Sequence, residues 1–201
     1  VETVQACTRF RRDVDSGRFD VDCAEADYVI EKIQTQFVHR KGEDLSGLPL
    51  RGKPLILEPW EKFCIYGILV FYIPGSKLRR IKEAFIFIPR KNGKTLFVAA
   101  LAWALALLSV KSGATIYIAM ESYRNIENNL TNHIYSSKDE AESEGWRILD
   151  NNNVHSISNN DIGGGSVYIE ALAANPDKQD SLNCKIAIAD ELHAFKSPKQ
   201  Y

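Results

Sequence analysis

The sequence predicts an α/β fold in which a parallel sheet is flanked by helices and preceded by a helical segment. Two short apolar runs, residues 84–88 and 114–119, and a third over residues 185–191 that ends in two carboxylates have the composition of strands buried on both faces of a sheet. A long apolar stretch, residues 96–110, separates the first two runs and is typical of a buried helix. Because strands and helices alternate along the chain, the pattern favours parallel pairing with helices on both faces.

Length and composition bound the class of protein. The chain has 201 residues, 25 Lys and Arg against 26 Asp and Glu, and 45% hydrophobic residues, which excludes disorder and a cysteine-stapled scaffold. Its formal charge of −1 gives no overall basic signal for nucleic acid. The cysteines and histidines are scattered, so we expect reduced thiols in a cytosolic protein and no metal-ligand cluster. The longest apolar stretch, residues 96–108, is shorter than the about 20 residues of a membrane span, so no membrane partner is expected.

The first forty residues are interpreted as helical, because Tyr28, Ile33 and Phe37 recur at helical spacing. Asp22 is expected to cap this helix, with Glu25 as its reciprocal partner.

Glycines and prolines predict the elements in the rest of the N-terminal half. Residues 42–54 carry five of them and are predicted to be a loop. Pro59 is expected to open a helix over residues 60–72, which the Pro-Gly pair at 74–75 ends.

The elements after residue 120 are predicted from shorter patterns. Residues 123–138 and 141–149 are interpreted as polar helices. Residues 154–157 and 166–172 are expected to be strands, joined by a hairpin turn at 159–165.

The clearest chemical signal is Gly93-Lys94-Thr95, between a predicted strand and a predicted helix. A phosphate chain needs backbone amides at a helix N-terminus, a lysine to meet its charge and a hydroxyl for Mg²⁺. Ile88 stands where the usual pattern has its first glycine, and the alternative interpretation is a chance Gly-Lys-Thr in a loop. The context favours a P-loop NTPase.

A second signal supports the first. The last apolar run delivers Asp190 and Glu191 at its carboxyl end, where one carboxylate can approach Mg²⁺ and the next can orient an attacking water. The alternative is that the two acids simply begin a helix, where the dipole favours them.

These segments resemble those of a known family, the large terminase subunits of tailed phages, which package DNA into capsids. Residues 88–95 resemble its variant Walker A, and residues 180–183 with 186–194 resemble its Walker B region. Residues 57–61 look like its Pro-Trp-Gln element, and the resemblance runs from about residue 55 to 196. It implies an ASCE-type ATPase core over residues 55–201, after an N-terminal helical segment over residues 1–54. The family's coupling motif and nuclease domain are expected to be absent from this chain.

The resemblance also implies roles for individual residues. Lys94 would contact the β and γ phosphates, Thr95 and Asp190 would hold Mg²⁺, and Glu191 would be the catalytic carboxylate. Arg90 would stabilise γ-phosphoryl charge, the alternatives being a solvated arginine or a DNA contact. The nucleotide-binding set is Pro89, Arg90, Lys91, Asn92, Gly93, Lys94, Thr95 and Glu61.

Glu61 departs from the family pattern, which has glutamine at this position. A carboxylate accepts from the adenine amino group but cannot donate to a ring nitrogen, so adenine selectivity at this position is open. Trp60 beside it is equally well explained as a core residue.

As a function, the resemblance implies an ATPase that uses ATP and Mg²⁺ to move double-stranded DNA. Its partners would be the DNA, the portal protein, the small terminase subunit and further copies in a ring. It would act in the cytoplasm of the infected host, docking on the procapsid. Two alternatives stay open: a helicase-like ATPase, since residues 190–193 fit an Asp-Glu-x-His box, and a nucleotide- or portal-binding module without turnover.

Other charged residues give weaker signals. A basic segment could touch DNA, although a charge run is usually a solvated face; it comprises Lys77, Arg79, Arg80 and Lys82, with Arg51 and Lys53 upstream. Arg124 and Arg147 are candidates to act on a neighbouring subunit's nucleotide, and His193 is interpreted as structural.

Overall fold

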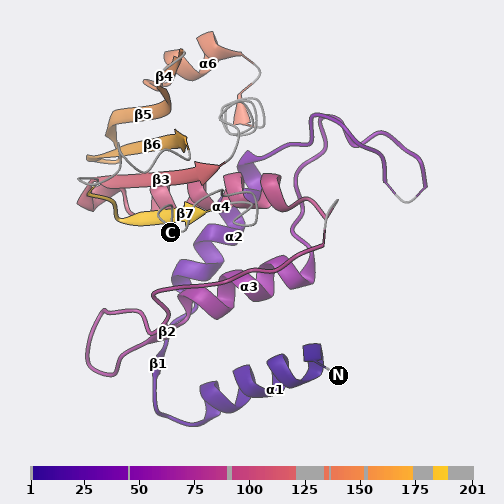
Figure 1. Cartoon of the computed structure of the whole chain (residues 1–201), viewed down its shortest axis with the longest axis vertical. Coiled ribbons are helices and arrows are strands. Elements are labelled where there is room, and N and C mark those ends of the chain that lie inside the picture. Colours follow the sequence, from indigo (N-terminus) through magenta and orange to yellow (C-terminus); the bar gives the residue numbers. More distant parts are fainter. Residues whose placement is uncertain are drawn as a thin grey trace.

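The helices and strands of the chain are seen in a computed structural model (Figure 1), which describes residues 2–44, 46–89, 92–120, 134–135, 137–151, 154–173 and 183–189. The helices are α1 (Glu2–Asp15), α2 (Ala24–Gln36), α3 (Pro59–Leu69), α4 (Lys94–Leu108), η1 (Val110–Ser112, a 3-10 turn) and α6 (Lys138–Ser143). The strands are β1 (Asp20–Val21), β2 (Phe71–Tyr72), β3 (Ala114–Met120), β4 (Arg147–Asp150), β5 (His155–Ile162), β6 (Gly165–Ala173) and β7 (Ile186–Ala189). The α/β class is confirmed.

In the part of the chain that the structure describes, the main sheet has five strands in the order β4-β5-β6-β3-β7. β3 pairs in parallel with both β6 and β7, whereas β5 pairs antiparallel with β4 and β6. The prediction of a parallel sheet is therefore wrong for one half of it. The physical reason is the short turn at Gly163 and Gly164, because so few residues join only antiparallel neighbours. The predicted hairpin and the strand at 114–119 are confirmed, and within the predicted strand at 185–191 the described part forms β7 over Ile186–Ala189.

Helix α4 lies at the centre of the core, as the apolar stretch predicts. It packs against α2 and against β3 and β6, and it passes behind the sheet in Figure 1. Its side chains from Ala99 to Ala106 are all buried, which fits a helix that is apolar on every side. Trp103 on this helix is 2% exposed, and its Nε1 donates to Gln36 Oε1 of α2 at 2.8 Å. One helix thus connects the N-terminal helices to the sheet.

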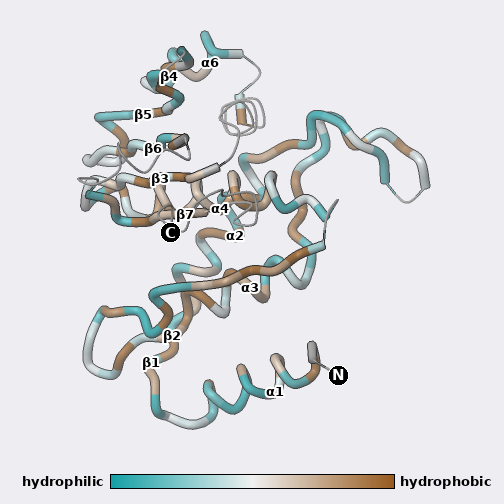
Figure 2. Tube along the Cα trace, in the orientation of Figure 1, coloured by the Kyte–Doolittle hydropathy of each residue, from teal (hydrophilic) through white to brown (hydrophobic). Residues whose placement is uncertain are grey.

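Residues 84–88 do not form the predicted strand. No strand or bridge is assigned over residues 83–89, and Phe85 and Phe87 are 76% and 85% exposed. The run is hydrophobic along its length (Figure 2), but a strand also needs a partner for its amides and carbonyls. Within the described residues no ladder includes this run, so its apolar composition alone does not make it part of the sheet.

Three smaller predictions also need correction. The helix predicted over residues 60–72 ends at Leu69, and Phe71 and Tyr72 pair with β1. Residues 141–149 are not one helix, since α6 ends at Ser143 and β4 follows at Arg147. The helix expected at 123–138 lies mostly outside the described residues.

The predicted capping partnership at α2 is also wrong. Asp22 Oδ1 does accept from the Ala24 amide at 2.8 Å, next to the helix start. The Glu25 carboxylate instead accepts from Arg79 Nη2 at 2.6 Å and from the Tyr72 hydroxyl at 2.7 Å. A distant guanidinium offers Glu25 a charge-assisted bond, which is stronger than a bond to a neutral amide.

Candidate nucleotide-binding site

The candidate phosphate site is built on the N-terminus of α4. Gly93 is the N-cap residue with φ +71°, a left-handed conformation that glycine adopts without steric cost. The Phe97 amide donates to the Gly93 carbonyl at 3.0 Å, and Asn92 Nδ2 donates to the Pro89 carbonyl at 3.1 Å across the preceding turn. The amides in the first turn of a helix have no partner within the helix and lie at the positive end of its dipole, which is the arrangement that binds phosphate.

Lys94 and Thr95 are the first two residues of α4, and both are partly exposed. A lysine and a hydroxyl therefore lie in the turn whose amides face an incoming anion. A hydroxyl oxygen is also a hard ligand of the kind that Mg²⁺ takes. The remaining loop residues, Arg90 and Lys91, lie outside the described residues.

The sheet brings the end of β7 toward this turn. β7 runs parallel to β3, with Ala189 opposite Ala119. In Figure 1 the arrowheads of both strands point toward the side on which α4 begins. Asp190 directly follows β7 in the sequence; it lies outside the described residues, as do Glu191 and His193. In the described residues no group of three His, Cys, Asp or Glu side chains is arranged to hold a metal ion.

Helix α3 contributes a wall beside the first turn of α4. The Trp60 ring lies 5.7 Å from the Phe97 ring at 62°, an edge-on contact one turn from the start of α4. Glu61 is 8% exposed, and its Oε2 accepts from the Glu58 amide at 2.8 Å within a capping box. Burial raises the pKa of the Glu61 carboxyl. Glu61 therefore has a capping role that the sequence reasoning missed; Glu58 departs from the usual Ser, Thr, Asp or Asn at the N-cap, so only Glu61 at the third helical position signalled it.

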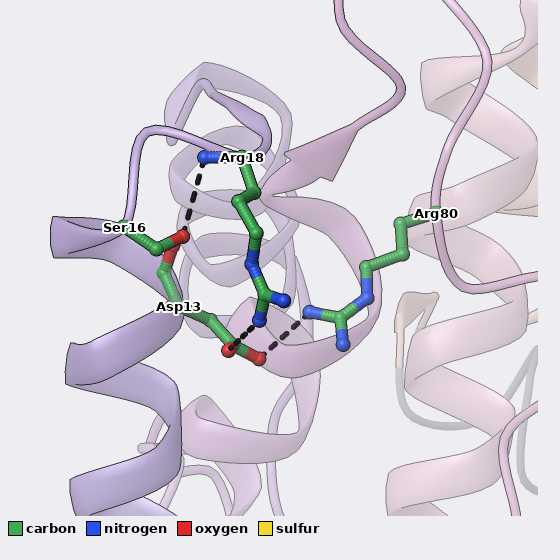
Figure 3. Close-up of polar contacts among 4 residues, drawn as sticks. All are labelled: Asp13, Ser16, Arg18 and Arg80. Carbon is green, nitrogen blue, oxygen red and sulfur yellow. Dashed lines mark hydrogen bonds and ion pairs between the residues drawn. The ribbon is translucent and has the colours of Figure 1, made fainter.

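Two arginines of the predicted basic segment face other side chains. Arg79 is bound to Glu25, as described above. Arg80 Nη1 donates to Asp13 Oδ2 at 2.8 Å, and its guanidinium lies 4.1 Å from the Phe19 ring centre. Figure 3 shows Arg18 reaching the same carboxylate, at 3.7 Å. Arg79 and Arg80 thus tie the turn after α3 to α2 and α1, whereas Lys77, Lys82, Arg51 and Lys53 are exposed.

Of the two candidate trans-acting arginines, the structure describes Arg147, which lies apart from the candidate site. Arg147 is exposed on β4, which lies at the opposite edge of the five-stranded sheet from β7. It lines a shallow polar depression with Asn159, Asn160 and Asp161. Arg124 lies outside the described residues. Arg147 therefore cannot reach a nucleotide at α4 of its own chain without crossing the sheet.

Comparison with known proteins settles the family. The sequence profile described as "Terminase large subunit, ATPase domain" matches residues 59–201, more than half of the chain. The chain belongs to this terminase ATPase family. The matched region begins at the first residue of α3 and includes α4 with the Gly93-Lys94-Thr95 sequence at its start. Neither the curated proteins nor the solved structures include a significant match.

Membership of the terminase ATPase family gives the function in outline. The family indicates a DNA-packaging ATPase that uses a nucleotide, with DNA and packaging proteins as general partners. Among the described residues, no helix is both long and apolar enough to cross a membrane.

Proposed function

We propose that this chain is the part of a phage terminase motor that hydrolyses ATP with Mg²⁺ to drive double-stranded DNA into the capsid. The observation that carries the proposal is the coincidence of two features. The family match covers residues 59–201, and within it the Gly93-Lys94-Thr95 sequence opens a buried helix. The chemistry expected from the sequence thus lies at a helix end suited to phosphate.

The loop from Pro89 to Thr95 would bind the triphosphate. The α4 amides would donate to its oxygens and Lys94 would neutralise its charge, both favoured by the helix dipole. Arg90 would meet the charge that grows on the γ-phosphoryl oxygens, since its guanidinium matches them in a bidentate way. Lys91 and Asn92 complete this loop.

Mg²⁺ would lower the charge repulsion between the β and γ phosphates and the incoming water. Thr95 and Asp190 would hold it, one from the start of α4 and one from just beyond β7. Glu191 would orient the water in line with the leaving oxygen and take its proton. Thr95 belongs to α4, and Asp190 directly follows β7 in the sequence; β7 pairs with β3, against which α4 packs.

We assign the adenine base to the start of α3, where Trp60 contacts Phe97 and Glu61 is buried. A glutamate with a raised pKa is more easily protonated, and a protonated carboxyl both donates and accepts a hydrogen bond, as an amide does. That property offsets part of the difference from the family's glutamine.

In the complete motor, we infer that this domain forms a ring with further copies and docks on the procapsid in the host cytoplasm. The portal protein and the small terminase subunit would be its partners. Each of these inferences rests on the family match, which indicates DNA and packaging partners in general.

Calorimetric titration with ATP, with and without Mg²⁺, tests the nucleotide site. The wild-type chain is expected to bind ATP more tightly with Mg²⁺. Lys94→Ala is expected to lose at least about 1.5–3 kcal/mol of binding, the range for a hydrogen bond to a charged group. Lys111→Ala, a lysine beyond the end of α4, is the matched control and should bind like wild type. Equal binding by wild type and Lys94→Ala would contradict the assignment.

A further inference from the structure

Helix α1 is attached to the rest of the chain along one narrow stripe. Ala6 and Phe10 are partly buried and Asp13 is 5% exposed, a spacing of four and three residues that marks one side of a helix. The Phe10 ring lies 5.1 Å from Phe71 and 5.7 Å from Phe63, both beyond α2 in the chain.

The Asp13 carboxylate completes the attachment. It accepts from Arg80 and pairs with Arg18 (Figure 3), and the hydrogen bond from Arg80 lowers the pKa of Asp13. Because this stripe holds one side of α1 against the body, the helix cannot turn about its own axis without breaking these contacts. The opposite side is therefore presented to solvent in a fixed orientation.

The outward side of α1 carries arginines. At 3.6 residues per turn, Arg11 and Arg12 lie opposite the Phe10–Asp13 stripe, and Arg9 lies at its flank. All three are exposed, and Arg11 and Arg12 line a shallow open depression with Asp15. Among the described side chains, no ion pair joins these three arginines to a carboxylate. We call Arg9, Arg11 and Arg12 the α1 arginine face.

This face contrasts with the basic segment at residues 77–82. There Arg79 forms an ion pair with Glu25, and Arg80 forms one with Asp13. On α1 the guanidinium groups point outward, with Asp15 as the one described acid among them. Two arginines of the segment that the sequence indicated are thus paired with carboxylates, whereas the three α1 arginines are exposed and, among the described residues, form no ion pair.

We propose that the α1 arginine face binds the phosphate backbone of double-stranded DNA. The proposal rests on the proposed function, which supplies DNA as the partner. Guanidinium forks match phosphate oxygens, and a rigid helix presents three of them without an ordering cost for the backbone. Contacts of this kind carry no base sequence, as a motor that passes along all sequences requires. With a net charge of −1 on the whole chain, the binding is weak and strongly dependent on salt.

The test measures DNA affinity against salt concentration. Fluorescence anisotropy with a labelled mixed-sequence duplex of about 30 base pairs is recorded between about 50 and 200 mM salt. The test variant carries Arg9→Gln, Arg11→Gln and Arg12→Gln, which keeps helix propensity nearly unchanged. The control variant carries Lys41→Gln, Lys111→Gln and Lys138→Gln, three exposed lysines away from α1. Both variants lose three positive charges, so they differ in where on the surface the charges are removed.

The arginine variant is expected to bind about tenfold or more weakly at low salt, with a log–log salt slope smaller by about 3, one unit per phosphate contact. The lysine control should keep the wild-type slope. A third variant carries Arg9→Lys, Arg11→Lys and Arg12→Lys. It keeps the positive charge of α1, and its DNA affinity should be within a few fold of wild type. Equal slopes for the arginine variant and wild type, or an equal loss in the lysine control, would overturn the proposal.

ATP titration distinguishes a failure of the DNA-binding proposal for α1 from a failure of the proposed ATPase function. ATP titration of the arginine variant should match wild type, because α1 lies outside the nucleotide site. If wild type binds ATP and the arginine variant binds DNA normally, the α1 assignment is wrong and the ATPase proposal stands. If the arginines control DNA binding in a chain that binds no ATP, the surface is supported and the proposed function fails.

Discussion

Replacing Trp103 with alanine should weaken the packing of α4 against α2 and against the aromatic rings around it. The Trp103 ring lies 4.5 Å from the Trp146 ring and 6.4 Å from the Tyr135 ring, and it donates to Gln36 of α2. A fully buried tryptophan replaced by alanine costs about 3–5 kcal/mol of unfolding free energy. At about 2–4 °C per kcal/mol for a chain of this size, the melting temperature should fall by about 6–20 °C.

The hydrogen bond can be measured apart from the packing. Trp103→Phe leaves Gln36 Oε1 without its donor, and Gln36→Leu leaves the indole N–H without its acceptor. Because the double variant removes both partners, a double-mutant cycle in urea should give a coupling energy of about 0.5–1.5 kcal/mol. Leu48→Ala, at a side chain 57% exposed, is the control and should change stability by less than about 0.5 kcal/mol. A Trp103→Ala chain as stable as that control would refute the packing described for α4.

The remaining predictions concern pH. Because burial raises the pKa of Glu61, the folded chain holds that proton more tightly than the unfolded chain, so unfolding free energy falls as pH rises from the ordinary value of 4.5. Glu61→Gln should remove this slope in urea titrations; an unchanged slope would contradict the buried capping role. The pKa of Asp13 is lowered, so its stabilisation is present above the ordinary value of 3.8 and is lost as pH falls through the lower folded pKa. The stability difference between wild type and Asp13→Asn should therefore shrink in acid, and a constant difference would exclude the pairing with Arg80.

Local patterns predicted the parts of the fold that depend on local physics. The apolar run after Gly93 predicted α4, because a helix apolar on every side has to be buried. The glycines at 163 and 164 predicted the β5–β6 hairpin, since both adopt positive φ in a tight turn. The same type of reasoning placed residues 93–95 at a helix N-terminus, where they lie, while their role in binding phosphate stays a prediction.

Ion pairs between residues far apart in the chain could not be predicted from local sequence patterns. The partners Arg79–Glu25 and Arg80–Asp13 are 54 and 67 residues apart, and no local spacing signals them. Residues 84–88 show the same limit, because an apolar run indicates a preference for burial but does not name a partner strand. Arg90, Asp190 and Glu191, which carry the proposed chemistry, lie outside the described residues, so their roles stay predictions.

The most direct test of the ATPase proposal is phosphate release by the terminase large subunit that carries this domain. With ATP, Mg²⁺ and double-stranded DNA, the wild-type protein should release phosphate steadily. Glu191→Gln should still bind ATP but release phosphate at least about 100-fold more slowly, because the water loses the group that orients and deprotonates it. Hydrolysis by Glu191→Gln at the wild-type rate would contradict the assignment.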